Sequence, residues 1–325
     1  MAETFYSQIA ANKRNSFLLT LVVVVLFALL GFSIGYAIGG DVASALVAMV
    51  IALVAAALLS AGSYFSGDSL VLAASSAKEV DSTSAPQLLN VVQEMAIAAN
   101  VPMPKVYVID DTAPNAFATG RDPQHASVAI TTGLLEKLDR EELQGVMGHE
   151  LSHVRNYDIR FALLVGVLVG SIALLADFFL RFTFWGGARR SRRDGDSGGN
   201  SLQAIMFVVA IVLAILAPIA SRLVQLAVNR QREYLADASS VELTRNPHGI
   251  ERALAKISAD QEVLEVANRA TQHMYFTNPI KKFEERSKGL FSTHPATVDR
   301  INRLRKLTGE GPLDAAESAQ LAGLD

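Results

Sequence analysis

Two long uncharged apolar stretches near the N-terminus constrain this chain more than any other feature of its sequence. The first covers residues 17–38 and the second runs from residue 42 to about residue 65, and neither contains Asp, Glu, Lys or Arg. About 20 apolar residues in a helix are enough to cross the hydrocarbon core of a bilayer. Both stretches are therefore predicted to be membrane-spanning helices, joined by a tight hairpin at residues 39–41.

Basic residues set the expected orientation of this hairpin. Lys13 and Arg14 precede the first stretch, whereas the turn between the two stretches has no Lys or Arg. Because cytoplasmic loops of membrane proteins carry an excess of Lys and Arg, the N-terminus is expected in the cytoplasm, and the chain returns there by residue 66. A secretory signal peptide is excluded, since the first stretch is too long for one and a second stretch follows at once.

Charged residues concentrate in two separate parts of the chain, which gives the expected domain organisation. Residues 67–160 and 229–325 hold 48 of the 61 charged residues, a density of about 25%, as in soluble domains. They are predicted to form the two halves of one cytoplasmic domain, interleaved with membrane segments at residues 1–66 and 161–228. This layout excludes a purely soluble protein, an all-membrane transporter and a disordered chain.

The second membrane segment, residues 161–228, brings two topological rules into conflict. Its apolar stretches 161–180 and 202–228 are long enough to cross, which gives four transmembrane helices in all. The loop 181–201 between them carries five arginines, which the charge rule would keep in the cytoplasm. We expect both stretches to cross. Every residue of a long apolar stretch favours insertion into the bilayer, whereas the charge rule is only a statistical tendency of loops. A pair that enters and returns without crossing is the alternative.

The overall composition removes several other classes of function. A formal net charge of −3 provides no basic surface for nucleic acid, so no nucleic-acid partner is expected. The chain has no cysteine, which excludes disulfides, thiolate metal ligands and a cysteine nucleophile.

Short strands and capped helices are predicted in the two cytoplasmic parts. Residues 105–110 and 127–131 have the composition of strands, and residues 115–120 are a further candidate. Asp139 begins a sequence that resembles a capping box, followed by apolar residues at helical spacing as far as Val154. Further helices are expected at residues 228–243, 250–267 and 297–307.

The strongest functional signal lies on the helix that begins at Asp139. His149 and His153 in the sequence His-Glu-Leu-Ser-His are four residues apart, so both imidazoles lie on one helix face and can bind one ion. Neutral imidazole suits Zn²⁺. Glu150, beside the first histidine, is placed to act as a general base toward water at the metal. A solvated helix face with two histidines is the alternative interpretation.

A catalytic zinc site needs a third protein ligand, and the sequence offers Glu233. Asp237 follows one helical turn later. Glu233 is expected to bind the metal, while Asp237 accepts a hydrogen bond from the other ring nitrogen of a zinc-binding histidine and so fixes its tautomer. Taken alone, this Arg- and Glu-rich segment is more typical of a solvated helix face. The zinc-binding pattern on the earlier helix favours the metal interpretation.

The two motifs together resemble a known family. His-Glu-x-x-His at 149–153 and Glu-x-x-x-Asp at 233–237 form the gluzincin pattern, and with the membrane segments around them the chain resembles the HtpX-type membrane zinc metalloproteases of family M48, related to the CAAX prenyl proteases. The resemblance covers nearly the whole chain. It implies a mainly α integral membrane protein with a small α+β gluzincin-type zinc protease domain. It also implies zinc ligands His149, His153 and Glu233, Glu150 as the base, and Asp237 beside His149.

The resemblance implies roles for other residues too. His294, which precedes Pro295, is similar to the family's histidine that steadies the oxyanion, although a His-Pro pair on its own is more often surface or core filler. The substrate is expected to lie along an edge strand. That strand would contain Asn115, Ala116, Phe117 and Ala118, for which ordinary strand and core positions are the alternative.

The function implied is that of a zinc metalloendopeptidase in the cytoplasmic (inner) membrane, multi-pass, with its active site facing the cytoplasm. Its expected partners are the lipid bilayer and membrane or unfolded protein substrates, as in protein quality control during stress. His153 lies eight residues before residue 161 and Glu233 five after residue 228, so zinc is expected close to the membrane face. A non-catalytic zinc-containing membrane scaffold or chaperone is the alternative; four protein ligands would then close the site.

Overall fold

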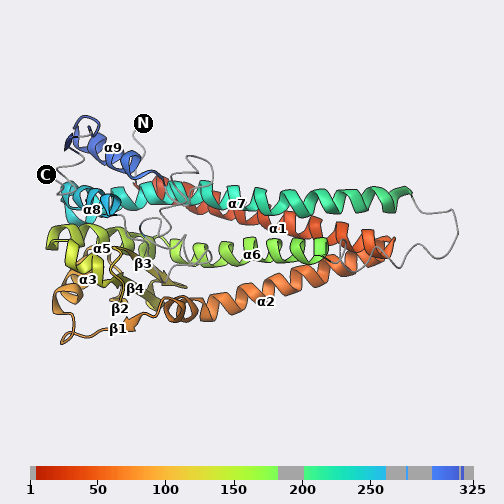
Figure 1. Ribbon diagram of the computed structural model, residues 1–325, viewed down its shortest axis with the longest axis horizontal. Coiled ribbons are helices and arrows are strands. Elements are labelled where there is room, and N and C mark those ends of the chain that lie inside the picture. Colours follow the sequence, from red (N-terminus) through yellow and green to blue (C-terminus); the bar gives the residue numbers. More distant parts are fainter. Residues whose placement is uncertain (1–4, 182–200, 261–275, 277–294, 315, 318–325) are drawn as a thin grey trace. The chain divides into compact units, whose positions relative to one another are not determined.

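The computed structural model describes residues 5–181, 201–260, 276, 295–314 and 316–317. These residues are mostly helical, with one small mixed sheet (Figure 1). The chain divides into two compact units, which we call the mixed unit and the helical unit. The mixed unit comprises Met1–Asn12, Tyr64–Leu163 and Leu226–Asp325, and the helical unit comprises Lys13–Ser63 and Leu164–Gln225.

The helical unit is built from parts of four long helices. They are α1 (Phe5–Gly39), α2 (Val42–Ala74), α6 (Asp158–Arg181) and α7 (Ser201–Thr244). Asp41 caps the start of α2, since its Oδ1 accepts a hydrogen bond from the N–H of Ser44 at 2.8 Å. Gly35 lets α1 and α2 approach closely, because a Cβ at this position would lie 2.8 Å from the carbonyl oxygen of Ser44.

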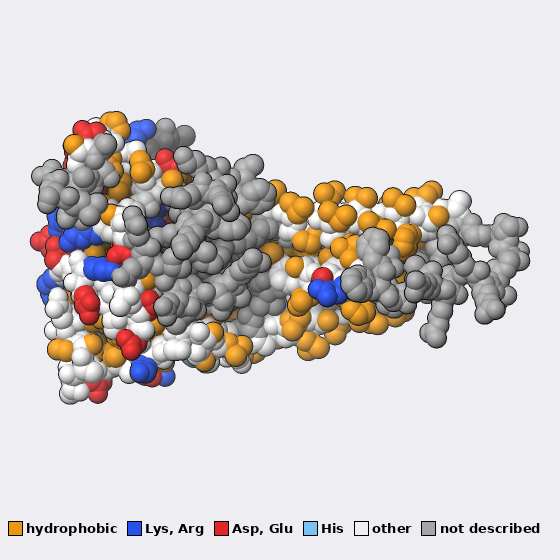
Figure 2. All heavy atoms as spheres, viewed as in Figure 1, with side chains coloured by type: hydrophobic (Ala, Val, Ile, Leu, Met, Phe, Trp, Pro, Cys, Tyr) orange, Lys and Arg blue, Asp and Glu red, His pale blue; other side chains and the backbone are white. Residues whose placement is uncertain are grey.

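Three of the described helices are long and apolar enough to cross a membrane. The qualifying stretches are Leu21–Gly39, Val42–Gly62 and Ser201–Ser221. Figure 2 shows hydrophobic side chains on the surface of the helical unit, a pattern that lipid accommodates and water does not. α6 is not among the three, so the fourth transmembrane helix expected from the sequence is not confirmed. The arginine-rich residues 182–200 lie outside the described part of the chain.

The mixed unit contains a four-stranded sheet with the order β1-β2-β4-β3. Its strands are β1 (Lys78–Glu79), β2 (Lys105–Ile109), β3 (Ala116–Gly120) and β4 (Ala126–Thr131). β2 and β4 are parallel, and the other two pairings are antiparallel. The strands predicted at residues 105–110 and 127–131 are confirmed, and the candidate at 115–120 is β3, at the edge of the described sheet.

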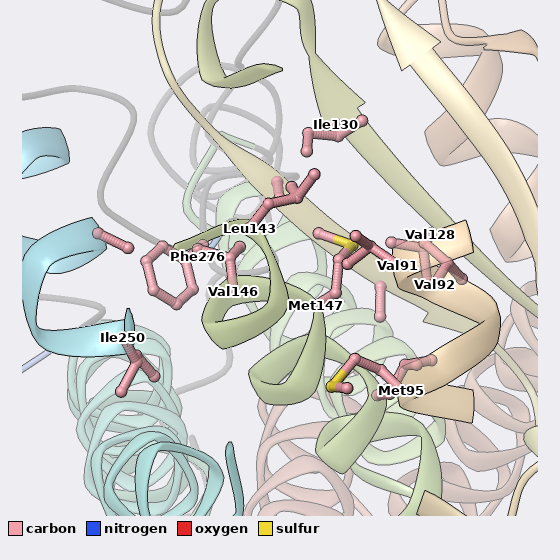
Figure 3. Packing of buried hydrophobic residues seen from close by; sticks show 14 of the residues in the cluster. Val91, Val92, Met95, Val128, Ile130, Leu143, Val146, Met147, Ile250 and Phe276 are labelled. Atoms are coloured by element: carbon pink, nitrogen blue, oxygen red, sulfur yellow. The ribbon is translucent and has the colours of Figure 1, made fainter. Parts of the chain in front are cut away.

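The remaining elements of the mixed unit are short helices. They are α3 (Pro86–Ala99), the 3₁₀ turn η1 (Pro123–His125), α4 (Thr132–Lys137), α5 (Arg140–Arg155), α8 (Pro247–Ala259) and α9 (Thr297–Thr308). α5 contacts α3, β3 and α8. Figure 3 shows its side chains in the core between those of α3 and Ile250 of α8. The α5 residues labelled in this view are Leu143, Val146 and Met147.

Both boundaries predicted for the helix at residues 250–267 are wrong. The helix expected at residues 250–267 begins at Pro247 and ends at Ala259. Proline is well tolerated in the first turn of a helix, where its missing N–H has no partner to lose, so α8 begins at Pro247 rather than at residue 250. Asp260 is extended, with ψ of 133°, and its carboxylate accepts a hydrogen bond from Lys137 Nζ at 2.6 Å.

Candidate active site

A capping box fixes the start of α5, the helix with the His-Glu-x-x-His motif. Asp139 Oδ1 accepts hydrogen bonds from the N–H groups of Glu141 and Glu142, at 2.8 and 2.9 Å. The carboxylate of Glu142 in turn accepts one from the N–H of Asp139 at 2.9 Å, which satisfies helix N–H groups that otherwise have no partner. Lys256 of α8 also lies 2.8 Å from Glu142. The predicted helix start is therefore confirmed, and an ion pair joins it to α8.

α5 is held closely against two other helices at Gly145. A Cβ at this position would lie 2.6 Å from the backbone nitrogen of Ile250, so α8 can approach only because the residue is glycine. The carbonyl of Gly145 accepts a hydrogen bond from Ser240 Oγ of α7 at 2.6 Å. α5 is thereby fixed relative to α7, the helix that contains Glu233.

Three side chains from α5 and α7 converge on one point. Nε2 of His149 and Nε2 of His153 are 3.1 Å apart, and the carboxylate oxygens of Glu233 lie 3.7 and 3.6 Å from them. Tetrahedral zinc with bonds of ~2.0–2.1 Å places its ligand atoms roughly 3.3 Å apart. The observed separations fit that geometry. Two imidazoles and one carboxylate are also a ligand set that catalytic zinc uses.

A second group of this kind is a weaker candidate. Side-chain ligand atoms of His248, Glu251 and Glu310 also lie within 4.8 Å of one another. His248 and Glu310 are exposed, however, whereas His149 and Glu233 are buried, and exposed acidic groups commonly lie together without an ion. The first group is therefore the candidate metal centre.

Asp237 orients His149. Its Oδ1 lies 2.9 Å from Nδ1 of His149, so the imidazole donates its Nδ1 hydrogen there and turns Nε2 toward the other two ligands. Burial opposes the ionisation of Asp237, but the guanidinium of Arg300 outweighs burial and lowers the pKa of this carboxyl below its ordinary value. The structure thus brings Asp237 to His149, the histidine that the resemblance to gluzincins indicated.

Asp158 holds the other histidine, and sequence reasoning missed it. Its Oδ2 lies 3.0 Å from Nδ1 of His153. Burial acts to lower the pKa of His153, but hydrogen bonds to Asp158 and Glu233 outweigh it and raise the pKa to about 10. Burial lowers the pKa of His149 to about 4. Since metals bind neutral imidazole, an ion that binds here displaces the proton of His153.

Arg300 is a second functional residue that sequence reasoning missed. Its side chain, from the first turn of α9, is only 1% exposed. It donates hydrogen bonds to both carboxylate oxygens of Asp237, at 2.8 and 2.6 Å, and to the carbonyl of Phe276 at 3.0 Å. Its Nη1 also lies 3.3 Å from Glu233. A guanidinium provides the planar fork that such bidentate pairing needs. The only sequence signal was its place shortly after the His294-Pro295 pair.

Glu150 lies beside the three ligands without belonging to the group. It is 2% exposed, and the backbone N–H of Ala118 in β3 donates a hydrogen bond to its carboxylate. Burial raises the pKa of Glu150 to about 7. A carboxyl with this pKa can both accept and release a proton near neutral pH.

The predicted substrate strand is part of β3 and lies next to Glu150. Ala116, Phe117 and Ala118 are buried, and Asn115, just before the strand, donates its N–H to Thr131 Oγ1 at 2.9 Å. On the edge facing away from β4, the carbonyl of Ala116 accepts a hydrogen bond from the N–H of Phe276 at 2.7 Å. His294, the predicted oxyanion-stabilising residue, lies outside the described residues.

The geometry of this site defines a class of protein. A His-His-Glu group on two helices, with a buried glutamate next to the first histidine, is the arrangement of a gluzincin-type metallopeptidase. Comparison with known proteins supplies the family. Residues 82–308 match Peptidase family M48. The chain belongs to this family and is of its HtpX type, that is, a membrane metalloprotease.

The HtpX assignment follows from relatives similar over nearly their whole length. A "Protease HtpX homolog" of Listeria monocytogenes serotype 4a (strain HCC23) is 44% identical over 306 residues. Relatives of the same description in Streptococcus uberis (strain ATCC BAA-854 / 0140J) and Streptococcus pneumoniae (strain Hungary19A-6) are 43% identical over 302 residues and 46% identical over 304. Each alignment covers 93% of this chain and 99% of the relative.

Proposed function

We propose that this protein is a zinc-dependent endopeptidase that cleaves misfolded or membrane-associated proteins at the cytoplasmic face of the cytoplasmic (inner) membrane. The observation that carries the proposal is the His149, His153 and Glu233 group, spaced for one zinc ion, with Glu150 buried beside it. Membership of family M48 and three apolar helices support a membrane protease.

Each residue of the group has a distinct task in this proposal. His149, His153 and Glu233 hold the metal. Zn²⁺, when bound, polarises the scissile carbonyl and lowers the pKa of water to about 7. Glu150 accepts a proton from the attacking water and passes it to the departing amine, a task for which its pKa of about 7 is suited. We assign His294 to the oxyanion, as the family resemblance implies.

The substrate is proposed to lie along β3. An extended peptide can add to a sheet edge through main-chain hydrogen bonds. On the edge of β3 that faces away from β4, the carbonyl of Ala116 pairs with the N–H of Phe276, so a bound peptide would take the place of this contact. The N–H of Ala118 contacts Glu150, so a peptide on this edge presents a peptide bond next to the proposed base. Residues 115–118 are therefore proposed to position the substrate.

We propose that the cytoplasmic protease domain is formed by residues 67–160 and 229–325, and that the segments at 1–66 and 161–228 lie in the membrane. Glu233 follows the apolar stretch Ser201–Ser221 by only 12 residues of the same helix, which keeps the active site near the membrane face. A single cysteine at position 197 in this Cys-free chain tests the topology. With a membrane-impermeant thiol reagent on intact cells, labelling supports four crossings. Labelling only after lysis leaves two.

A non-catalytic zinc-containing scaffold or chaperone is the competing function. Such a protein would close its zinc with four protein ligands, whereas the described residues contribute three to this group. A narrow processor of prenylated peptides and a broad quality-control protease would share the same metal group. Sequencing the cleavage products of purified enzyme, given unfolded membrane proteins and prenylated peptides, distinguishes them.

Substitution of Glu150 tests the proposed function. Glu150→Gln is expected to lower the turnover of an unfolded protein substrate by about 10²–10⁴-fold, because the amide cannot accept the proton. Glu242→Gln, a carboxylate paired with Arg155 away from the metal group, is the control and should retain activity. Wild-type turnover in Glu150→Gln, or no turnover in the wild-type protein, would overturn the proposal.

A further inference from the structure

The His153 side of the metal group contains two buried charged residues that the proposed chemistry does not use. Asp158 is 5% exposed and Arg232 is 6% exposed. Asp158 Oδ2 lies 3.0 Å from Nδ1 of His153, and Arg232 Nε lies 3.4 Å from Oδ1 of the same carboxylate. Burying charges is costly unless they are paired, which calls for a reason why both are there.

We propose that Asp158 and Arg232 are positioning residues for the metal: Asp158 fixes the tautomer and ring orientation of His153, and Arg232 holds Asp158 in place. A neutral imidazole has one ring hydrogen and one free lone pair. When Nδ1–H donates to Asp158, the lone pair is on Nε2, the atom that faces His149 and Glu233. The proposal rests on the zinc assignment made above.

The backbone between the two helices is shaped to deliver Asp158 to His153. Five residues along a continuous helix turn the chain by about 140° beyond one full revolution, so the two side chains would point to different faces. α5 instead ends at Arg155, and Tyr157 adopts φ of +61°. This left-handed conformation is unfavourable for a large side chain. It breaks the helix and brings Asp158, the first residue of α6, back to His153.

Arg232 is fixed by contacts of its own. Its guanidinium stacks on the ring of Phe161 at 3.5 Å, and Nη1 donates to the backbone carbonyl of Asp158 at 3.4 Å. Arg232 also immediately precedes Glu233 on α7. Two adjacent residues of α7 therefore serve the same metal site. Glu233 is a ligand, and Arg232 holds Asp158, the carboxylate that contacts the ligand His153. Any shift of α7 would move both together.

A purely structural role for Asp158, at the start of α6, is the competing explanation. A carboxylate in the first turn stabilises a helix by interacting with its dipole. That role predicts that loss of Asp158 lowers the thermal stability of the zinc-free protein and leaves zinc affinity unchanged. A positioning role predicts a loss of zinc affinity that exceeds any change in the stability of the zinc-free protein.

Zinc affinity of the full-length protein in detergent, measured by competition with a chelator, separates the two. Asp158→Ala is expected to weaken zinc binding about 10–100-fold, as loss of such carboxylate partners does. Asp158→Asn should lose less, because its amide oxygen still accepts the Nδ1 hydrogen. Arg232→Met should show a smaller loss than Asp158→Ala. Glu242→Gln, which removes another carboxylate contact between α5 and α7, should bind zinc like the wild type.

The outcomes are decisive whether or not peptidase activity is detected. Unchanged zinc affinity in both Asp158 variants would overturn the proposal. An equal loss in Glu242→Gln would do so too, because the effect would then be general. If Asp158→Ala does not fold, Asp158→Asn and Arg232→Met decide between the two explanations. A wild-type protein that binds zinc but cleaves nothing would defeat the proposed function alone, whereas one that binds no zinc would defeat both.

Discussion

Each histidine of the metal group contacts an aspartate that is itself paired with an arginine, but the two arrangements differ in burial and in distance. On the His149 side, the imidazole is 1% exposed and Arg300 grips both oxygens of Asp237, at 2.6 and 2.8 Å. On the other side, the His153 side chain is 15% exposed and Arg232 approaches Asp158 at 3.4 Å. The difference shows that one side is closed and part of the core, whereas the other is reached by solvent.

This difference predicts how much each side contributes to the stability of the fold and to metal affinity. Breaking a fully buried ion pair leaves an uncompensated charge away from water, which costs folding free energy. The Asp158–Arg232 pair is buried as well, but its ion-pair distance is 3.4 Å against 2.6 Å for Arg300 and Asp237, so its loss removes a weaker interaction and should cost less. We therefore expect the His149 side to contribute more to the stability of the fold, and both sides to contribute to metal affinity.

Removal of Arg300 should have the largest effect on stability. Arg300→Met leaves the carboxylate of Asp237 buried without its guanidinium, and should lower the free energy of unfolding of the zinc-free protein by about 3–5 kcal/mol. Arg232→Met should cost distinctly less. Unfolding of both variants by denaturant in detergent measures the difference. A larger cost for Arg232→Met would reverse the comparison.

Removal of Asp237 should weaken zinc binding next most strongly. Asp237→Ala is expected to lower zinc affinity by about 10–100-fold without removing a ligand, and by more than Asp158→Ala, because the His149 contact is more buried. Chelator competition on the two variants side by side gives the ratio. Unchanged affinity in Asp237→Ala would show that this carboxylate does not set His149.

The smallest loss of stability is expected for substitution of Ser240, which contacts α5, the helix that contains both histidines. Its hydroxyl ties α7 to the carbonyl of Gly145 on α5 at 2.6 Å. Ser240→Ala should cost about 1 kcal/mol of stability, the usual net contribution of one hydrogen bond. Zinc affinity should not change, because neither Asp–His contact is touched. A clear loss of zinc affinity would mean that the spacing of α5 and α7 is set by this single bond.

Sequence reasoning reached the candidate ligands because their spacing is local. His149 and His153 are one turn apart on one helix, and Asp237 is one turn from Glu233, so helix geometry alone puts each pair on one face. The long apolar stretches were found in the same way, from composition along the chain. Three of the four expected spans qualify in the structure.

The supporting residues could not be found in this way. Arg300 is 63 positions from the carboxylate it pairs with, and no local sequence pattern distinguishes it from the other arginines of the chain. Asp158 is close in sequence to His153, but reaches it only because Tyr157 adopts a left-handed conformation that its residue type does not favour. Such contacts follow from tertiary packing, which overrides the helical periodicity used to read the sequence.

The central claim is that two neighbouring carboxylates have separate tasks, since Glu233 holds the metal and Glu150 serves the chemistry. The zinc content of Glu233→Gln and Glu150→Gln, purified without chelator beside the wild type, tests it most directly. We predict one zinc per chain in the wild type and in Glu150→Gln, and little zinc in Glu233→Gln. A zinc-free Glu150→Gln, or a Glu233→Gln that retains its full zinc, would contradict the assignment.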